Sequence, residues 1–549
     1  MDNKRVIVAV VLSMLVLIGW NFIFPPQPTQ QVVSTQGNAS QQAAPANTTE
    51  TARQTAAASA DIEAQPITVV KGEEVTVKTP LYTAVFNSAG GILEQFTLHK
   101  YKETIEPDSP DVDLIGSAVV KGPMGLLLNR KSTWAIGSWG SATDINGKPV
   151  KSLDVSGENT TQIVFTGEVD GIRIKRVFTF DAATYLVREQ VHLVNTGDQP
   201  VGGNLRFTLA SSSLTKAEDR YNRTRVAALT PSGLEQEHDV DDLETEGVII
   251  DNNVIWAGIE SNYFLLAVTP KESDNPGQDV GYVAKVDDSV YRVALERRLG
   301  NLEPGSETLV DANYYFGPKD EQVMKGTPNQ MAKAITFGWF DIIAKPLLVA
   351  LNLFYKFVGN YGVAIILLTI VIKILFWPLS HKSYKSMNQM KKLQPMMAKI
   401  REKYKDDKQK MQQEMMGLYK TYKVNPAGGC LPMVLQIPVF IGLYEALLNS
   451  IQLRHAPFIT HVPFTNIIWL ADLSAKDPFY VTPIIMGLTM FLQQKMTPQP
   501  GDPTQAKVMM FMPLIFTFIF LNFPAGLVAY WLTNNVISII QQRWMLKKA

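Results

Sequence analysis

The sequence predicts a membrane protein with an α-helical core of five transmembrane helices, an additional N-terminal anchor helix and a large antiparallel β-sandwich outside the membrane. Three observations indicate this fold class. One apolar run long enough to cross a bilayer lies near the N-terminus, and five more follow residue 359. Short alternating runs typical of half-buried strands fill the region between them. The 51 Lys and Arg residues equal the 51 Asp and Glu residues in number, but the two signs are concentrated in different segments.

Residues 1–24 are predicted to form an uncleaved transmembrane anchor. Lys4 and Arg5 precede an apolar run of 19 residues, which is long for the apolar part of a secretory signal peptide. The segment that follows, from Trp20 to Pro25, offers no A-x-A cleavage site, so a cleaved signal peptide is the less favoured alternative. Residues 25–66 are rich in Gln, Thr, Ala and Ser and contain few large apolar residues, so they are predicted to form a flexible polar linker.

Residues 67–330 are predicted to form the β domain. Alternating apolar and polar runs separated by turn residues occur at 75–77, 81–86, 92–98, 162–165, 171–180, 185–194, 248–250 and 263–268. In the run 185–194, Val187, Val191 and Leu193 fall on one face and polar residues alternate with them, as in a strand buried on one side. About 250 residues of this pattern favour a large sandwich of two sheets, and Gly90 and Gly91 are expected to supply a turn or bulge between strands.

Residues 335–358 are predicted to form an amphipathic helix that lies on the outer membrane surface. Its apolar face would comprise Trp339, Phe340, Leu347, Leu348, Leu351, Phe354 and Tyr355. A seventh transmembrane helix is the alternative. Asp341, Lys345, Pro346 and Lys356 disfavour a span, because charged residues and proline are costly within a membrane helix.

Five transmembrane helices are predicted at residues 360–377, 428–448, 479–496, 508–523 and 525–540. They alternate with a helical hairpin at 378–426, an outer loop at 450–478, an inner loop at 497–507 and a C-terminal tail at 541–549. The last two spans have only about 16 residues each, and spans this short are accommodated by thinning of the bilayer. Local thinning is therefore a hypothesis, and lipid order measured around the reconstituted protein would test it.

The distribution of charge predicts the orientation of these spans. Residues 1–5, the hairpin, the inner loop, the tail and Lys495 contain 19 Lys and Arg residues against 6 Asp and Glu residues. The remaining segments outside the spans contain 31 Lys and Arg residues against 44 Asp and Glu residues. A surplus of 13 positive charges on one side thus balances 13 negative charges on the other. By the positive-inside rule the hairpin and both termini are cytoplasmic, and the asymmetry excludes a charge-neutral soluble protein.

Lys373 lies inside the apolar run 360–377, where a charge needs a partner, water or a function. An ammonium group at the centre of a membrane helix costs about 2.5 to 3.5 kcal/mol. Because Lys373 is only five residues from Pro378, its side chain has the reach to extend to the membrane interface, which is a purely structural alternative. The position of Lys373 alone leaves the functional and the structural interpretation open.

Further polar residues in the spans are expected to surround Lys373. Thr369 is four residues away and therefore lies on the same helix face. Gln436 lies between two prolines, where missing backbone donors leave carbonyl groups that need other partners. The last span contributes an aromatic and polar stripe of Tyr530, Trp531, Asn534, Asn535 and Ser538. Together these residues are predicted to line a hydrated groove, and interhelical hydrogen bonding without a groove is the alternative.

The hairpin at 378–426 is predicted to contain helices at 380–404 and 407–423, with Asp407 as the N-cap of the second. Methionines recur at helical spacing along both helices. One interpretation is that they form only the seam between the two helices. The other is a surface that receives varied apolar partners, because flexible thioethers adapt to them. The residues predicted for that surface are Met387, Met390, Lys391, Lys392, Met411 and Met415.

The sequence contains no recognisable catalytic or cofactor-binding motif. There is no G-x-x-x-x-G-K-[ST] phosphate loop, no H-E-x-x-H, no C-x-x-C and no G-x-S-x-G. Cys430 is the only cysteine, so the β domain has no intrachain disulfide bond, and the 6 histidines are scattered. We therefore predict a protein that is not an enzyme and has no catalytic residues, cofactor or metal site.

Several short motifs in the C-terminal half closely resemble the YidC family of bacterial inner-membrane protein insertases. They are NPAGGCLP at 425–432, QIP at 436–438, FPAGL at 523–527, QQ at 541–542, KKLQP at 391–395 and QEMM at 413–416. The resemblance extends from about residue 359 to the end, and its motifs are specific. The β domain after a polar linker is similar in architecture to the long Gram-negative form of the family.

The resemblance implies a periplasmic β-supersandwich and a five-helix core whose groove is closed toward the periplasm and open to the cytoplasm and lipid. It implies a multi-pass protein of the bacterial inner membrane that acts as an insertase and chaperone. Such a protein captures nascent inner-membrane proteins in the groove and releases their hydrophobic segments into the bilayer, alone or with the Sec translocon. A positive charge in the groove attracts acidic termini of clients. The family usually has arginine at the position of Lys373, and lysine keeps the charge without the planar bidentate fork.

The partners implied by the resemblance are nascent inner-membrane proteins, the Sec translocon, ribosomes and membrane lipids, without specific binding of nucleic acid. The methionine and lysine surface of the hairpin would contact clients or the ribosome. The tail has only Arg543, Lys547 and Lys548 as basic residues, which weakens the expectation of ribosome docking through the tail.

A small-solute transporter or channel with a ligand-binding periplasmic domain is the main alternative function. It would need a continuous or alternating path and more paired charges within the spans than the sequence contains. A second alternative is an enzyme or carbohydrate-binding module in the β domain. No acidic pair there stands out among the 44 Asp and Glu residues outside the inner segments and spans.

Overall fold

The structure is a computed structural model of the chain, and it describes residues 72–116, 118, 122–157, 160–214, 221–237, 240–245, 247–250, 253–270, 280–287, 289–422, 424, 431–462, 465, 467–497 and 503–548. The predicted anchor at 1–24, the predicted linker at 25–66 and the motif residues 425–430 lie outside this set. The chain divides into the units Met1–Ala58 and Ser59–Ala549, and all described residues belong to the second.

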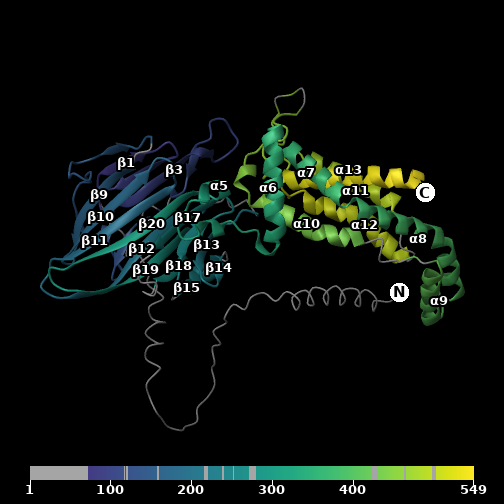
Figure 1. Cartoon of the computed structure of the whole chain (residues 1–549), viewed down its shortest axis with the longest axis horizontal. Helices are drawn as coiled ribbons and strands as arrows, with labels where there is room; N and C mark the ends of the chain where they lie inside the picture. Colours follow the sequence, from purple (N-terminus) through teal and green to yellow (C-terminus); the bar gives the residue numbers. More distant parts are fainter. Residues whose placement is uncertain are drawn as a thin grey trace, which may run out of the picture. The chain divides into compact units, whose positions relative to one another are not determined.

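Three β-sheets form the N-terminal part of the described chain (Figure 1). The first has five strands in the order β4 (Asp111–Asp113), β3 (Ile92–Lys102), β2 (Tyr82–Asn87), β1 (Glu74–Lys78) and β8 (Ser152–Asp154). The second has nine strands in the order β14 (Gly233–Glu237), β13 (Arg225–Thr230), β16 (Trp256–Glu260), β17 (Phe264–Pro270), β20 (Glu307–Pro318), β11 (Leu186–Asn195), β10 (Ile172–Asp181), β9 (Thr160–Val169) and β7 (Ser138–Trp139). The third has six strands in the order β15 (Val248–Ile250), β18 (Val280–Asp287), β19 (Val290–Leu302), β12 (Val201–Ser212), β5 (Leu126–Leu128) and β6 (Lys131–Ser132).

The predicted antiparallel β domain is confirmed, and each of the eight predicted runs lies largely within a strand. Neighbouring strands are antiparallel, apart from the parallel pairing of β1 with β8. The number of sheets differs from the expected two. The nine-stranded sheet packs against both smaller sheets, through Phe86 and Phe178 (ring centroids 5.3 Å apart) and through contacts of β12 with β16. A twisted sheet of nine strands is wider than either partner, so both smaller sheets pack against it.

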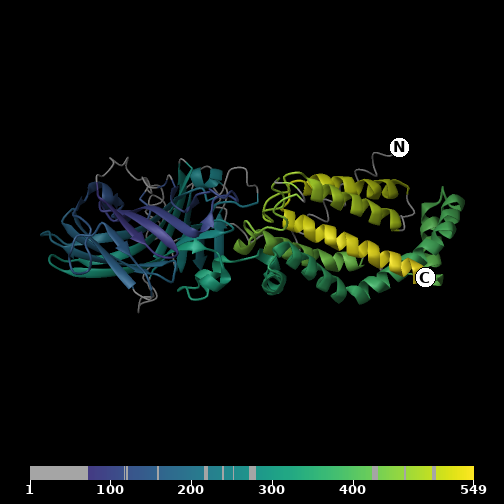
Figure 2. The same ribbon diagram turned by 90° about the horizontal axis from the view of Figure 1, so that it is seen from above.

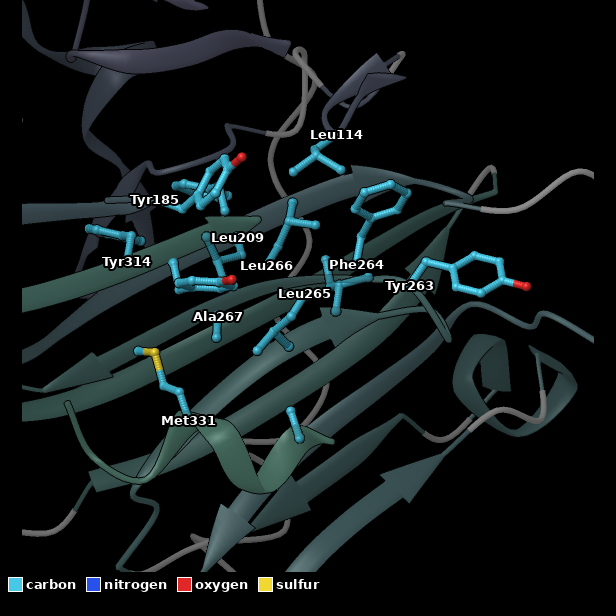
Figure 3. Packing of buried hydrophobic residues seen from close by; sticks show 14 of the residues in the cluster. Leu114, Tyr185, Leu209, Tyr263, Phe264, Leu265, Leu266, Ala267, Tyr314 and Met331 are labelled. Atoms are coloured by element: carbon cyan, nitrogen blue, oxygen red, sulfur yellow. The ribbon is translucent and has the colours of Figure 1, made fainter. Parts of the chain in front are cut away.

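The alternation predicted for residues 185–194 is present in β11. Val187, Val191 and Leu193 are fully buried, whereas Arg188, Gln190 and His192 on the opposite face are half-buried or exposed. They join a continuous apolar core, part of which Figure 3 shows around Leu266 and Tyr314. The alternating pattern therefore places one face of each strand in the core.

The turn between β2 and β3 requires glycine, as predicted. Gly90 and Gly91 have positive φ angles of 86° and 61°, a region that side chains with a Cβ rarely adopt. A Cβ added at Gly90 would lie 2.4 Å from the Cβ of Trp134. Conformation and close packing thus both exclude a larger residue at this position.

A buried charge network joins the sheets beside this turn. The Arg176 and Glu189 side chains are both 0% exposed, and Arg176 Nε donates to Glu189 Oε1 at 2.5 Å. Tyr314 Oη donates to the other carboxylate oxygen at 2.7 Å. The guanidinium Nη atoms donate to the carbonyl oxygens of Gly90, Gly91 and Met124. One arginine therefore ties β10 and β11 to segments of the two smaller sheets.

A second buried network surrounds Glu260 at the end of β16. Its carboxylate accepts hydrogen bonds from Lys319 Nζ at 2.8 Å and from Arg225 Nε at 2.7 Å, and Gln236 donates to it as well. Burial alone raises the pKa of Glu260, but the charges and hydrogen bonds of Lys319 and Arg225 outweigh burial and lower the pKa below 4.5.

This lowered pKa predicts that the β domain loses stability in acid. Because the folded carboxylate has a lower pKa than the unfolded one, the unfolded state binds more protons as the pH falls below about 4.5, and the free energy of unfolding decreases. Glu260→Gln should flatten this decrease and lower stability at neutral pH by about 2 kcal/mol. Denaturant unfolding of the purified protein from pH 7 to pH 3 measures both effects. Glu307→Gln, at an exposed carboxylate, is the control, and an unchanged acid slope in Glu260→Gln would contradict the assignment.

The C-terminal part of the described chain is helical. Its helices are α6 (Asp341–Val358), α7 (Tyr361–Leu375), α8 (Trp377–Lys403), α9 (Lys408–Thr421), α10 (Leu431–Leu448), α11 (Val481–Met496), α12 (Pro503–Phe520) and α13 (Ala525–Lys548). Short helices α3 (Thr133–Ile136), α4 (Val240–Thr245) and α5 (Glu321–Met324) belong to the preceding part. α13 contacts α7, α8, α10 and α11, and Figure 2 shows it running between the other helices. α8 and α9 form the predicted hairpin, and the Asp407 side chain caps α9 by accepting a bond from Lys410 N at 3.0 Å.

A helix lies in each of the five apolar runs predicted to span the membrane. By length and composition, no single described helix qualifies as a span. α7 and α8 qualify as a pair bent by 64°, and Leu435–Leu448 and Met509–Phe520 are shorter apolar helices. The assignment of the individual spans stays a prediction.

Two helices extend beyond the boundaries expected from the apolar runs. α13 continues to Lys548, through most of the predicted tail, because Gln, Arg, Leu and Lys are good helix formers. α12 begins at Pro503, inside the predicted inner loop, because proline suits the first helical position. Apolar composition marks the lipid-compatible stretch of a helix rather than its ends.

The segment predicted as an amphipathic helix at 335–358 is helical only from Asp341, after 3₁₀ turns at Met331–Ala334 and Gly338–Phe340. Leu348 and Leu351 are buried, and α6 contacts α7 and α10. Ile342 and Phe357 are 88% and 80% exposed. Apolar side chains thus project from more than one face of α6, and its place on the membrane surface stays a prediction.

Candidate functional site

α7 positions Lys373 in its last turn. The helix begins where the Asn360 side chain accepts a hydrogen bond from Val363 N at 3.0 Å. It ends at Leu375, and Pro378 follows in the first turn of α8. The carbonyl end of a helix carries partial negative charge, so the ammonium group is placed where the helix itself favours a cation.

The Lys373 side chain is buried against α13 rather than extended away from it. Only 8% of the residue is exposed, and Nζ donates a hydrogen bond to Ser538 Oγ at 2.8 Å. Ser538 in turn donates to the carbonyl oxygen of Asn534 at 2.7 Å. Among the described residues, Lys373 forms no ion pair with a carboxylate. A buried cation with neutral partners attracts an anion, because its charge is not compensated locally.

Gln436 joins α10 to the same stretch of α13. Its Nε2 donates to Asn534 Oδ1 at 2.5 Å, one helical turn before Ser538. Lys373, Gln436, Asn534 and Ser538 therefore form one connected group, which we call the polar cluster. It brings together side chains from α7, α10 and α13.

An aromatic layer adjoins the polar cluster toward the start of α13. Trp531 packs edge-to-face on Phe440 of α10, with ring centroids 4.7 Å apart. It also contacts Phe520 of α12 at 5.4 Å, and Tyr530 lies parallel to Phe440 at 6.2 Å. Large rings from three helices thus fill the space on one side of the polar cluster.

Two residues predicted to line the same groove have other partners. Thr369 is 1% exposed, and its hydroxyl donates to the carbonyl oxygen of Ile365 in its own helix at 2.7 Å. Asn535 Nδ2 donates to Thr489 Oγ1 of α11 at 3.4 Å. Asn535 therefore faces α11, while the adjacent Asn534 belongs to the polar cluster.

Three of the seven methionines of the hairpin, Met390, Met397 and Met415, lie in the seam between its helices. Leu393, Met397 and Val424 are buried together, and Met390 and Met415 pack against them. Met387 and Met411 are half-buried, whereas Lys391 and Lys392 are exposed. The seam interpretation thus describes Met390 and Met415, and the lysines remain accessible to a partner.

Tyr384 and Gln541 belong beside the polar cluster but were not among the predicted site residues. The Tyr384 phenol lies beside the Ser538 side chain. Gln541 is 2% exposed and follows Ser538 by three residues on α13. The helical spacing of Gln541 from Asn534 and Ser538 is a signal that the sequence contained, whereas the approach of Tyr384 depends on the bend between α7 and α8.

The arrangement suits binding rather than catalysis. Within the described residues, no three His, Cys, Asp or Glu side chains are grouped to hold a metal ion. The polar cluster combines one cation with hydroxyl and amide groups, none of which is paired with a general base. These groups can bind a carboxylate or a peptide segment in an apolar setting.

Comparison with protein families covers nearly all of the described chain. Residues 74–350 match the family described as the YidC periplasmic domain. Residues 353–549 match the family described as 60Kd inner membrane protein. The two matches meet within α6.

Relatives share this organisation over their full length. The chain is 53% identical to a membrane protein insertase YidC of Maridesulfovibrio salexigens, covering 100% of this chain and 99% of the relative. It is also 53% identical to one of Nitratidesulfovibrio vulgaris strain DP4, covering 100% of both chains. A crystal structure of an active YidC insertase is 19% identical, with a TM-score of 0.35, over 87% of this chain and 95% of that one. The chain belongs to the YidC family of membrane protein insertases, non-enzymatic proteins of the inner membrane that have a periplasmic domain.

Proposed function

We propose that the chain inserts newly made inner-membrane proteins by receiving their polar segments at the polar cluster. The observation that carries this proposal is the buried Lys373 ammonium group, which has Ser538 as its hydrogen-bond partner and no acidic partner among the described residues. Such a charge attracts the acidic end of a client chain. Thr369, Tyr530, Trp531 and Asn535 would complete the walls of a hydrated groove around it.

The energetic role of the groove is to lower the cost of moving a polar segment into the membrane. A charged side chain at the bilayer centre costs about 2.5 to 3.5 kcal/mol on insertion scales, and water and polar groups in the groove reduce that cost. The hydrophobic segment of the client then gains by moving sideways into lipid, because each buried CH₂ group contributes about 0.8 kcal/mol. Capture is therefore electrostatic and release is hydrophobic, without a nucleotide.

The proposed topology places both termini and the hairpin in the cytoplasm and the β domain in the periplasm. The charge asymmetry along the chain supports this orientation. Leu375 of α7, Leu488 of α11 and Phe518 of α12 are 74%, 63% and 64% exposed. Large exposed apolar side chains on several helices suit a surface that faces lipid.

The hairpin is proposed to meet clients, and ribosomes, before the polar cluster does. Lys391 and Lys392 are exposed on α8, where they suit an anionic partner. Met387 and Met411 are half-buried and offer adaptable apolar contact. The Sec translocon is a further proposed partner. Because the C-terminal tail is short and has few basic residues, we expect it to contribute little to ribosome binding.

Reconstitution in lipid vesicles separates this function from small-solute transport. Purified protein in vesicles is expected to insert a single-span client with an acidic translocated end, measured by protection from external protease, without increasing the flux of small solutes. Empty vesicles are the control for spontaneous insertion. Solute flux without client insertion would favour the transporter or channel instead.

A further inference from the structure

α13 carries buried hydrogen-bond donors that lack acceptors. In the described helical part, the buried side-chain nitrogen and oxygen atoms without a hydrogen bond are Tyr530 Oη, Trp531 Nε1 and Gln541 Nε2, all on α13. The Tyr530 hydroxyl lies beside the Gln436 side chain, although their geometry is not that of a hydrogen bond. Trp531 Nε1 and Gln541 Nε2 likewise have no hydrogen-bond acceptor among the described residues.

These donors share a face of α13 with the polar cluster. At 100° per residue, positions 531, 534, 538 and 541 fall within a sector of about 80°. Ten residues separate Trp531 from Gln541, which corresponds to about 15 Å along the helix axis. Asn534 and Ser538 lie between them, and Lys373 meets this face at Ser538.

The side chains at this face of α13 are mainly hydrogen-bond donors. The indole Nε1 can only donate, the amide nitrogen of Gln541 donates, and the Lys373 ammonium group has three N–H bonds, one of which points to Ser538. Buried donors in folded proteins are almost always satisfied, so donors left open beside a binding site point to an acceptor that arrives with the ligand.

We propose that Trp531, Lys373 and Gln541 form a donor ladder that binds the carbonyl and carboxylate oxygens of an extended client segment. An extended chain rises about 3.3 Å per residue, so the ladder matches about four to five client residues. This inference rests on the proposed function and extends it from acidic clients to uncharged polar ones. Lys373 provides most of the attraction for acidic ends, and the neutral donors provide most of the binding for neutral ends.

Substitution of Gln541 tests the ladder in the full-length protein reconstituted in vesicles. Gln541→Leu removes the donor and should slow insertion of a client with a neutral translocated end rich in Asn, Gln and Ser by about five-fold, the effect of losing one hydrogen bond. An acidic client should be slowed by less than about two-fold, because its recognition depends on Lys373. Ile540→Leu, on the opposite face of α13 where the residue is 62% exposed, is the control and should leave both clients unaffected.

Substitutions that keep or reverse the hydrogen-bonding role of residue 541 distinguish loss of a hydrogen-bond donor from a change in packing. Gln541→Lys keeps N–H donors and should retain insertion of the neutral client, whereas Gln541→Glu offers acceptors and should be slower than Gln541→Leu. The melting temperature of Gln541→Leu should equal or exceed that of the unaltered protein, because an unsatisfied buried donor is removed. Trp531→Phe should reproduce the loss specific to neutral clients.

Two results would overturn the ladder: unaltered insertion of the neutral client by Gln541→Leu, or Gln541→Glu at least as active as Gln541→Lys. Failure of the proposed function has a different signature. In that case Lys373→Glu would also leave the acidic client unaffected, whereas failure of the ladder alone would leave the Lys373 effect intact.

Discussion

Lys373→Glu is expected to slow insertion of clients with an acidic translocated end by at least about tenfold, because attraction between the two charges becomes repulsion. Lys373 is buried and bound to Ser538, so the new carboxylate would face the same space. Lys373→Ala should have an intermediate effect, since it removes attraction without adding repulsion. Lys373→Arg should be tolerated, because it keeps the charge and adds donors.

Insertion rates in vesicles, for one client with an acidic end and one with a neutral end, measure this effect. Ile374→Leu is a suitable control because Ile374 is adjacent, 63% exposed and apolar. Its insertion rates should match those of the unaltered protein. Equal rates for Arg, Ala and Glu at position 373 would reduce Lys373 to a structural residue.

Arg176→Met is expected to lower the free energy of unfolding of the β domain by about 3 to 5 kcal/mol, because it leaves a buried carboxylate without its cation. Glu189 would keep only the Tyr314 hydroxyl as a hydrogen-bond donor among the side chains described here, and three carbonyl groups would lose the guanidinium. Denaturant unfolding followed by the fluorescence of the full-length protein measures the change.

Two further variants identify the cause of this loss. Arg188→Met, on the exposed face of β11, should change the free energy of unfolding by less than about 0.5 kcal/mol. Combining Arg176→Met with Glu189→Leu should restore part of the stability, because no charge is then left buried. A loss in Arg176→Met no larger than that in Arg188→Met would contradict a structural role for the network.

The β domain could be predicted from the sequence because its strands are buried on one face. Period-two alternation marked β11, and the two glycines marked the turn after β2. The burial of Glu189 could not be predicted from this alternation. Glu189 lies on the apolar face of β11 between Val187 and Val191, where a charged residue is not expected. Its burial depends on Arg176, which pairs with it across neighbouring strands. The division into three sheets likewise depends on pairing between segments far apart in sequence.

The residues of the candidate site could be selected from the sequence, but their partners could not. Charged and amide residues in apolar runs are few, so Lys373, Gln436 and Asn534 were evident. Which of Asn534 and Asn535 faces Gln436 depends on the rotation of α13 against its neighbours, and the structure assigns Asn535 to α11. Gln541 was recognised only as part of a motif, because the apolar run ends at residue 540. The helix α13 itself continues past this point to Lys548.

The central claim is that the polar cluster recognises the charge of a client, and an exchange of charges tests it most directly. Insertion would be measured in vesicles without a membrane potential for two matched clients, one with an acidic and one with a basic translocated end, using the unaltered protein and Lys373→Glu. We predict that the unaltered protein inserts the acidic client faster and that Lys373→Glu inserts the basic client faster. Equal loss of both clients in Lys373→Glu would contradict the claim.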